Sequence, residues 1–268
     1  MERSSPYLHP VIATAIVINS GVLALALLGS GSDPAPLWRL LGEDGLVEWM
    51  QFLCFSVLAL LLGFVAVDRA ARSSWMRLEV IGIAGLSLLV ALAALEEISW
   101  FQRVLGIESP EFFRQNNRQF ETNLHNLALG SASLHKTILV KLIFLVGITH
   151  NVILPLLARS RPALKRWVES FGLYLPPLSA AFAYLLLVLL SHLLIEHPRK
   201  GELGEMFGAV HYLSTVFAAY LIGMGYGSPA VLENKADGRR VSILFAMLMV
   251  FLLFVSWLLG AAYAPGQG

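Results

Sequence analysis

Two neighbouring carboxylates, Glu96 and Glu97, end an apolar run and begin the most polar part of the chain. A carboxylate at the edge of hydrocarbon is costly unless it is paired, hydrated or bound to a metal, so this pair is a candidate for acid–base chemistry. Neighbours on a helix point about 100° apart. We therefore expect one of the two to face the protein interior and the other to face the headgroup layer or to pair with Arg103. The alternative is a helix that simply ends in water.

Three further pairs have the spacing of one helical face: Glu121 with His125, His192 with Glu196, and Glu202 with Glu205. This spacing puts two metal ligands, or an acid and the His that it orients, on the same side of a helix. One such pair is typical of a hydrated helix edge. Three pairs at one membrane level indicate a shared site.

The candidate site residues fall into three groups. The catalytic candidates are Glu97, Glu121 and His125. The side chains predicted to bind substrate are Trp100, Gln102, Arg103, Arg118, Asn123 and Asn126. The candidate ligands of a divalent metal ion are Glu48, Glu96, His192, Glu202, Glu205 and His211. His211 lies deep in an apolar segment, where a structural hydrogen bond is an equal alternative, and Glu48 also suits the dipole at a helix start.

These residues belong to a chain of 268 residues that is 57% hydrophobic and only 14% charged. Apolar segments long enough to span a bilayer, about 20 residues each, indicate an integral membrane protein. A net charge of +1 offers no basic stripe for nucleic acid. The single cysteine, Cys54, lies in an apolar segment and is interpreted as a core residue.

The apolar segments predict an all-α fold, a polytopic transmembrane bundle of about seven helices in one domain, residues 1–268. The expected spans are at about 10–28, 46–67, 78–97, 137–157, 172–195, 203–226 and 241–262. The polar loop 99–136 is expected to form short interfacial helices. Ser109 as N-cap before Pro110 predicts a helix over about 110–118, and a second is predicted over about 121–129.

Charge in the loops predicts the orientation. Eleven Lys and Arg residues fall in the loops on the side of the N-terminus and seven on the other side, so the N-terminus is predicted to be cytoplasmic and the C-terminus outside. Twelve acids and five of the seven histidines fall on the outer side. The chemistry is therefore expected at the outer face of the membrane.

The stretches Glu96–Arg103, Glu121–Asn126 and Glu43–Glu48 resemble those of a family of bacterial polytopic membrane proteins of unknown function. The resemblance covers about a tenth of the chain and implies a bacterial inner membrane and the same polar residues, but no reaction. Phe101 and Phe120 stand where the pattern has glycine. Two bulky rings there are expected to narrow the approach to the site and to change its substrate.

Three classes of function fit these residues. The leading hypothesis is an enzyme, assisted by a divalent metal ion, that acts on a lipid or lipid-linked substrate at the outer leaflet of the inner (plasma) membrane. The alternative is a non-enzymatic subunit or assembly factor that docks a partner membrane protein through residues 99–126. A transporter is third, because the acids stop at one side, whereas conduction needs polar groups through the whole thickness.

Overall fold

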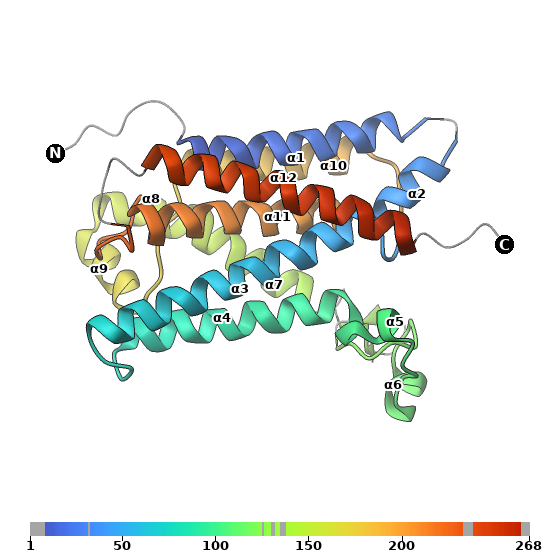
Figure 1. Cartoon of the computed structure of the whole chain (residues 1–268), viewed down its shortest axis with the longest axis horizontal. Helices are drawn as coiled ribbons and strands as arrows, with labels where there is room; N and C mark the ends of the chain where they lie inside the picture. Colours follow the sequence, from blue (N-terminus) through green and yellow to red (C-terminus); the bar gives the residue numbers. More distant parts are fainter. Residues whose placement is uncertain are drawn as a thin grey trace.

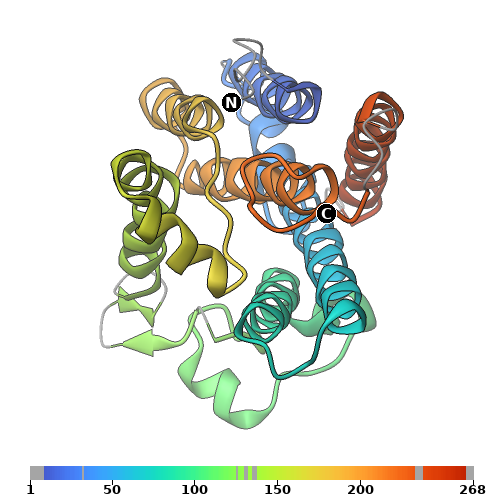
Figure 2. The same cartoon turned by 90° about the vertical axis from the view of Figure 1, so that its left-hand side faces the viewer.

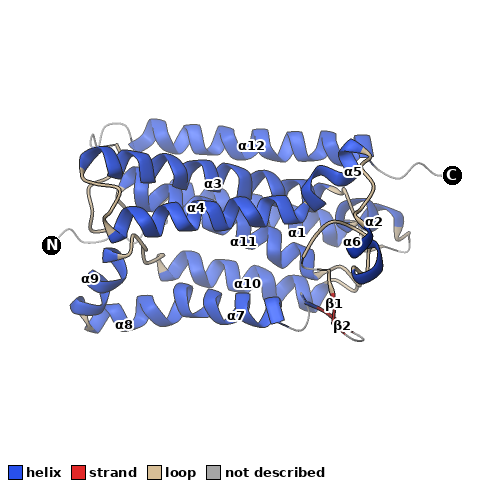
Figure 3. Ribbon diagram, turned by 90° about the horizontal axis from the view of Figure 1, so that it is seen from below, coloured by secondary structure: helices blue, strands red, loops and turns tan. Residues whose placement is uncertain are grey.

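The computed structural model describes residues 9–31, 33–124, 126–129, 132–134, 138–232 and 238–263. Long helical segments run side by side along its longest axis (Figures 1 and 3). In chain order they are α1 (Pro10–Leu28), α3 (Leu46–Arg72), α4 (Leu78–Glu97), α7–η3–α8 (Val140–Ile148, Thr149–Ile153, Leu154–Ser160), α10 (Leu178–Leu194), α11–η4 (Gly201–Val216, Phe217–Leu221) and α12 (Gly238–Tyr263). The predicted all-α bundle is confirmed.

Five helical segments are long and apolar enough to cross a membrane: Pro10–Leu28, Ala35–Arg72, Leu78–Glu97, Lys141–Ser160 and Arg239–Ala262. The helix α10 is apolar but shorter. Large apolar side chains such as Leu60, Leu88 and Phe251 point outward, where a soluble protein would carry polar groups. The chain is thus an integral membrane protein. Crossings by α10 and α11, which would make the total seven, stay a prediction.

The helix α11 lies at the centre of the bundle, with α1, α3, α10 and α12 around it (Figure 2). Its composition explains this position, because small residues let neighbouring backbones approach closely within a membrane. Gly208 is an example: a Cβ atom there would stand 3.3 Å from the hydroxyl of Tyr184 on α10. Nearly all of α11 from Leu203 onward is buried.

The two ends of the bundle differ in charge. We call one the acidic end; it contains α2 (Ala35–Leu41), η1 (Ser99–Phe101), α5 (Gln102–Leu105), α6 (Glu111–Asn116) and the strands β1 (Ala128–Leu129) and β2 (Ala132–Ser133), which pair antiparallel. We call the other the basic end; it contains the turn 73–77, α9 (Pro162–Ser170) and the loop 223–232. The predicted segregation of acids to one side is therefore visible as a difference between the ends.

The loop after α4 differs from its predicted form. The helix predicted over 121–129 is wrong, because the chain turns at Glu121 and then enters β1. The amide of Asn117 donates to the backbone oxygen of Asn123 at 2.8 Å, and its side-chain oxygen accepts from the backbone N–H of Gln119 at 2.9 Å. Such side-chain bonds compete with helical ones and favour turns.

The predicted helix over 110–118 exists as the shorter α6, but Ser109 does not cap it. The hydroxyl of Ser109 accepts from the amide of Gln102 at 2.6 Å and donates to the backbone oxygen of Phe120 at 2.5 Å. The side chain that a cap would need is therefore used to hold two distant parts of the loop together.

Candidate functional site

A left-handed turn begins the site. Ser99, Trp100 and Phe101 have φ of 47°, 57° and 61°, a region in which residues other than glycine are uncommon. Such residues cost on the order of 1–3 kcal/mol each and persist only where the surroundings fix them. The turn follows the end of α4 and leads into α5, which brings Arg103 into contact with Glu48 in the first turn of α3.

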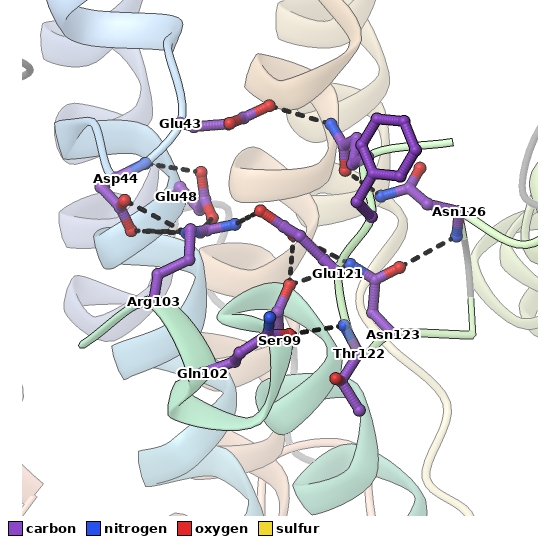
Figure 4. A network of polar contacts seen from close by, with 12 residues as sticks. Glu43, Asp44, Glu48, Ser99, Gln102, Arg103, Glu121, Thr122, Asn123 and Asn126 are labelled. Carbon is purple, nitrogen blue, oxygen red and sulfur yellow. Dashed lines mark hydrogen bonds and ion pairs between the residues drawn. The ribbon is translucent and has the colours of Figure 1, made fainter. Parts of the chain in front are cut away.

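Arg103 lies at the centre of a group of carboxylates that we call the Arg103 cluster (Figure 4). Its Nη1 is 2.7 Å from Glu121 Oε1, and its Nη2 is 3.1 Å from Asp44 Oδ1 and also contacts Glu48 Oε1. The side chain of Arg103 is only 20% exposed, and those of Glu48 and Glu121 are 8% and 11% exposed. One cation thus joins α3, α5 and the loop after α6.

Burial of the Arg103 guanidinium opposes its charge, but Glu48, Glu121 and Asp44 outweigh that effect and raise the pKa of Arg103 above its ordinary value. Arg103 is therefore a permanent cation. Its guanidinium donates to Asp44 along one edge and to Glu121 along another. A planar guanidinium can do this, and the ammonium of a lysine cannot.

Glu121 is held from a second side by neutral groups. Its Oε2 accepts from the hydroxyl of Ser99 at 2.5 Å and from the amide of Asn123 at 3.1 Å, and that amide also reaches the Ser99 hydroxyl at 2.9 Å (Figure 4). The left-handed turn is thereby tied to the loop. The backbone N–H of Thr122 donates to Gln102 at 2.6 Å and adds a second tie.

Glu48 connects the Arg103 cluster to a second arginine. Arg199 Nη2 lies 3.8 Å from Glu48 Oε2 and 3.4 Å from Glu202 Oε1, and Arg199 Nη1 lies 3.3 Å from Glu43 Oε1. Arg199 comes from the turn before α11. The two arginines therefore bridge the start of α3, the loop after α4 and the start of the central helix.

Glu97 lies on the inner side of this arrangement. Its carboxyl is within electrostatic range of Glu205, Glu202 and Glu48 and beside the amide of Gln51. Gln51 is 1% exposed, and its Nε2 lies 3.4 Å from Glu205 Oε2. We call Gln51, Glu97, Glu202 and Glu205 the Glu97 cluster. Of the two neighbouring acids, Glu97 is the one that faces the interior, as expected for one member of the pair.

Glu96 points the other way. Its carboxylate accepts from the indole N–H of Trp100 at 2.8 Å and from the backbone N–H of Leu124 at 2.6 Å. Trp100 is 44% exposed. The bond between Glu96 and Trp100 holds the outer side of the loop. The contacts described for Glu96 do not include Arg103.

The other predicted residues are spread more widely. Arg118 is exposed, and Asn126 bonds to Asn123 and Gln119 within the loop. His192 is exposed on α10, which ends at Leu194, so its predicted partner Glu196 lies beyond the helix. His125 lies outside the described residues.

His211 is 4% exposed and bonds through Nε2 to Asn151 Oδ1 at 2.8 Å, six residues along α11 from Glu205. The structural hydrogen bond that the sequence allowed for His211 is therefore present.

Five participants were not among the candidate residues: Arg199, Asp44, Gln51, Glu43 and Ser99. Arg199 stands three residues before Glu202, which is ion-pair spacing. Asp44 lies two residues before α3, with a φ of 55°, and its backbone N–H donates to Glu48. Gln51 is a polar residue inside an apolar run, one turn after Glu48, and this was the available signal.

Among the described residues, no group of three or more His, Cys, Asp or Glu side chains is placed to hold a metal ion. In the Arg103 cluster the guanidinium takes the central position among the carboxylates that a cation would need. The described residues therefore do not fit the predicted divalent ion.

Comparison of the chain with models of protein families, with curated proteins and with solved structures found no match. Function is therefore inferred from the site alone.

Proposed function

We propose that the acidic end holds the active site of a membrane-embedded enzyme in which Glu97 acts as general acid or base. The observation that carries this proposal is the environment of Glu97, which faces three other carboxyl groups and the buried amide of Gln51. Carboxyl groups within electrostatic range of one another in a partly buried setting repel one another, and protonation of one relieves the repulsion. A carboxyl that exchanges its proton easily suits acid–base catalysis.

Gln51 is suited to assist both protonation states. Its amide N–H can donate to a carboxylate, and its Oε1, which is buried and has no hydrogen-bond partner among the described residues, can accept from a carboxylic acid. In this proposal Gln51 positions Glu97 and Glu205. The Arg103 cluster holds the loop over them, while a role of Arg103 or Arg118 in binding an anionic headgroup stays a prediction.

The proposed substrate is a lipid or a lipid-linked molecule. The Glu97 cluster lies where the apolar part of α4 ends, which is the level at which headgroups meet protein. We place the acidic end at the outer face of the plasma membrane, with the N-terminus in the cytoplasm, because Lys and Arg gather in the loops of the other side.

The test compares membranes of cells that lack the protein with membranes of cells supplied with the wild type, Glu97→Gln or Glu108→Gln. Glu97→Gln keeps the shape and removes the charge. Glu108 is a matched control, because its side chain is 91% exposed and lies on the loop that follows α4. We expect a lipid or lipid-linked species to accumulate without the protein, to disappear with the wild type and Glu108→Gln, and to persist with Glu97→Gln. Normal lipids in cells with Glu97→Gln would refute the proposal.

A second candidate function is docking of a partner membrane protein. The observation that favours it is a set of exposed apolar side chains on the loop after α4: Trp100, Phe101, Leu105, Ile107, Phe112, Phe120 and Leu124. Exposed apolar groups gathered on one polar loop are typical of interaction surfaces. Site-specific cross-linking from position 112 in native membranes tests this. Cross-links to one protein in stoichiometric yield would favour docking, and cross-links to lipid alone would count against it.

A further inference from the structure

A line of buried polar side chains runs along α11 through the apolar interior. His211 and Asn151 are 4% and 1% exposed, and they bond to each other at 2.8 Å. The amide nitrogen of Asn151 donates to the backbone oxygen of Gly147 at 2.9 Å and to the hydroxyl of Tyr212 at 2.7 Å. Because a backbone oxygen can only accept, these bonds orient the amide, and His211 must donate from Nε2.

The line continues toward the basic end. His150 stacks on Tyr212, with ring centres 5.9 Å apart, and its Nε2 lies 2.8 Å from the backbone oxygen of Tyr174. The hydroxyl of Tyr174 lies 2.7 Å from that of Thr215, which also reaches the backbone oxygen of His211 at 2.9 Å. Both imidazoles thus carry hydrogen on Nε2, which leaves Nδ1 of each as the basic nitrogen.

Three aromatic side chains bring the line to the surface at the basic end. The ring of Tyr174 contacts that of Tyr220, and Tyr220 contacts Tyr226, with ring centres 5.7 Å and 4.9 Å apart. The hydroxyl of Tyr226 donates to Glu79 Oε1 at 2.9 Å. Glu79 lines a cavity of about 450 Å³, together with Arg77, Arg166 and Glu169.

At the other end, Tyr184 extends the line toward Glu205, since its hydroxyl lies beside Gly208, about one turn of α11 from Glu205. The ring of Tyr184 stacks on His211 with centres 4.9 Å apart and planes 17° apart, and Tyr184 is within electrostatic range of Glu205. A small cavity among α1, α10 and α11 is lined by Tyr184, His211, Asn19 and Ser214. Polar groups therefore occur at successive levels between the two ends of the bundle.

Two parts of this line lie on π-helical turns. His150 and Asn151 belong to η3, and Tyr220 belongs to η4. The π-helix is rare, and single turns of it are frequent at functional sites. Polar groups in the interior of a membrane protein are expensive and commonly mark ion or proton pathways.

We propose that these side chains form a proton path between Glu205 at the acidic end and Glu79 at the basic end. A carboxyl group at one end takes up a proton, and the hydroxyl and imidazole groups between them pass it on by breaking and forming O–H and N–H bonds only. One proton enters and one leaves, and the proton gradient across the membrane drives the transfer. Asn151 positions His211 and Tyr212 and does not carry the proton.

The path is gated. Ring contacts, not described hydrogen bonds, link Tyr184 to His211, His150 to Tyr212, Tyr174 to Tyr220 and Tyr220 to Tyr226. The Nε2 bonds of His211 and His150 end on the Asn151 amide and on a backbone oxygen. A proton can cross these steps only when side chains rotate or water molecules enter, so transfer is tied to movement of the protein. This inference does not rest on the enzyme proposed above, and its readout is separate.

The experiment measures proton flux into liposomes that contain the purified full chain and an internal pH-sensitive dye, under a potassium diffusion potential with valinomycin. We expect faster acidification than in liposomes without protein. Tyr174→Phe and Tyr184→Phe remove one hydroxyl each and keep the ring, and His211→Gln removes the imidazole. Each should lower the flux about tenfold or more, the scale of effect of a positioned proton-transfer group.

Ser256→Ala is the matched control, because it removes a buried hydroxyl on α12 that bonds within its own helix at 2.7 Å, away from the line. It should leave the flux unchanged. Thermal unfolding of each variant shows whether it folds, and the Tyr→Phe variants carry the test if His211→Gln does not. The proposal would be overturned if the wild type gave no more flux than empty liposomes. It would also be overturned if the folded path variants gave the same flux as the wild type, or if Ser256→Ala lost as much flux as they do.

Discussion

At the scale of the residue, Arg103 provides the positive charge that lets several carboxylates lie close together at the acidic end. Three carboxylates from two separate parts of the chain meet at one guanidinium, and two of them are nearly buried. Removing one partner of a buried ion pair leaves the other charge buried without compensation. This lowers stability more than replacing both partners with apolar residues.

Arg103→Ala should therefore lower the free energy of unfolding by roughly 2–4 kcal/mol, somewhat less than for a fully buried pair because the side chain is partly exposed. Arg103→Lys should retain only part of the stability, since one ammonium cannot bond along two edges. Thermal unfolding in detergent measures both. Arg114→Ala is the control, because Arg114 is 57% exposed and 3.8 Å from an exposed Glu108. Equal losses at both arginines would contradict this account.

Phe120 gives a second prediction at this scale. Its φ is 60°, and it is one of the two phenylalanines that stand where the resemblance has glycine. The side chain is 66% exposed, so little packing is lost on removal. Phe120→Gly should be more stable than Phe120→Ala by about 1 kcal/mol, since a left-handed residue with a Cβ is strained by that order.

The same pair of substitutions at Phe112 should give the opposite order. Phe112 is also exposed but lies on α6, where alanine is favoured over glycine by about 1 kcal/mol. Chemical unfolding of the four variants measures the two differences. An advantage of alanine at both positions would show that the backbone at Phe120 is not left-handed.

At the scale of the element, the packing of α4 against α9 depends on close approach of two backbones. A Cβ atom on Gly82 would stand 1.9 Å from the backbone oxygen of Phe171, where α9 ends. Gly172 follows with a φ of 76°, and a Cβ there would stand 2.5 Å from the backbone oxygen of Glu79. This contact fixes the position of Glu79 at the basic end.

Gly82→Ala should therefore destabilise the protein by about 1–3 kcal/mol, the usual range for overpacking. Gly85→Ala, one turn further along α4, has nothing within 4 Å of its new Cβ and should be neutral or stabilising by up to about 1 kcal/mol. Thermal unfolding of both variants in the same detergent is the measurement. A Gly82→Ala protein as stable as the wild type would mean that α9 does not pack on α4 in this way.

At the scale of the whole molecule, charge is divided between the ends of the bundle, and α11 connects them. The acidic end combines many carboxyl groups with few arginines, and the basic end carries most of the Lys and Arg residues. The orientation of such a protein follows its positive loops.

A cysteine in place of Arg114 should react with a membrane-impermeant maleimide on intact cells. A cysteine in place of Lys165, on α9, should react only after the membrane is opened. The side chains now at these positions are 57% and 44% exposed. The natural Cys54 is completely buried and should give little background. If only the variant with cysteine at position 165 were labelled on intact cells, the protein would have the orientation opposite to the predicted one.

The sequence by itself determined the class of the protein and the location of its polar residues. Apolar length specifies a membrane bundle, because a helix in lipid must satisfy its own backbone, and composition alone carries that information. The acids Glu97, Glu121, Glu202 and Glu205 were placed correctly at one end, since position along a span sets depth.

Only the tertiary structure decided which polar groups meet. Glu48 and Arg103 are 55 residues apart in the chain, and His211 and Asn151 are 60 apart, so no local spacing predicts either pair. In the loop after α4, bonds from Asn117, Ser109 and Gln102 override the helical pattern. For the polar line along α11, the sequence predicted hydrogen bonding of single members such as His211 but not which groups pair. Its members come from separate parts of the chain, and only packing brings them into contact.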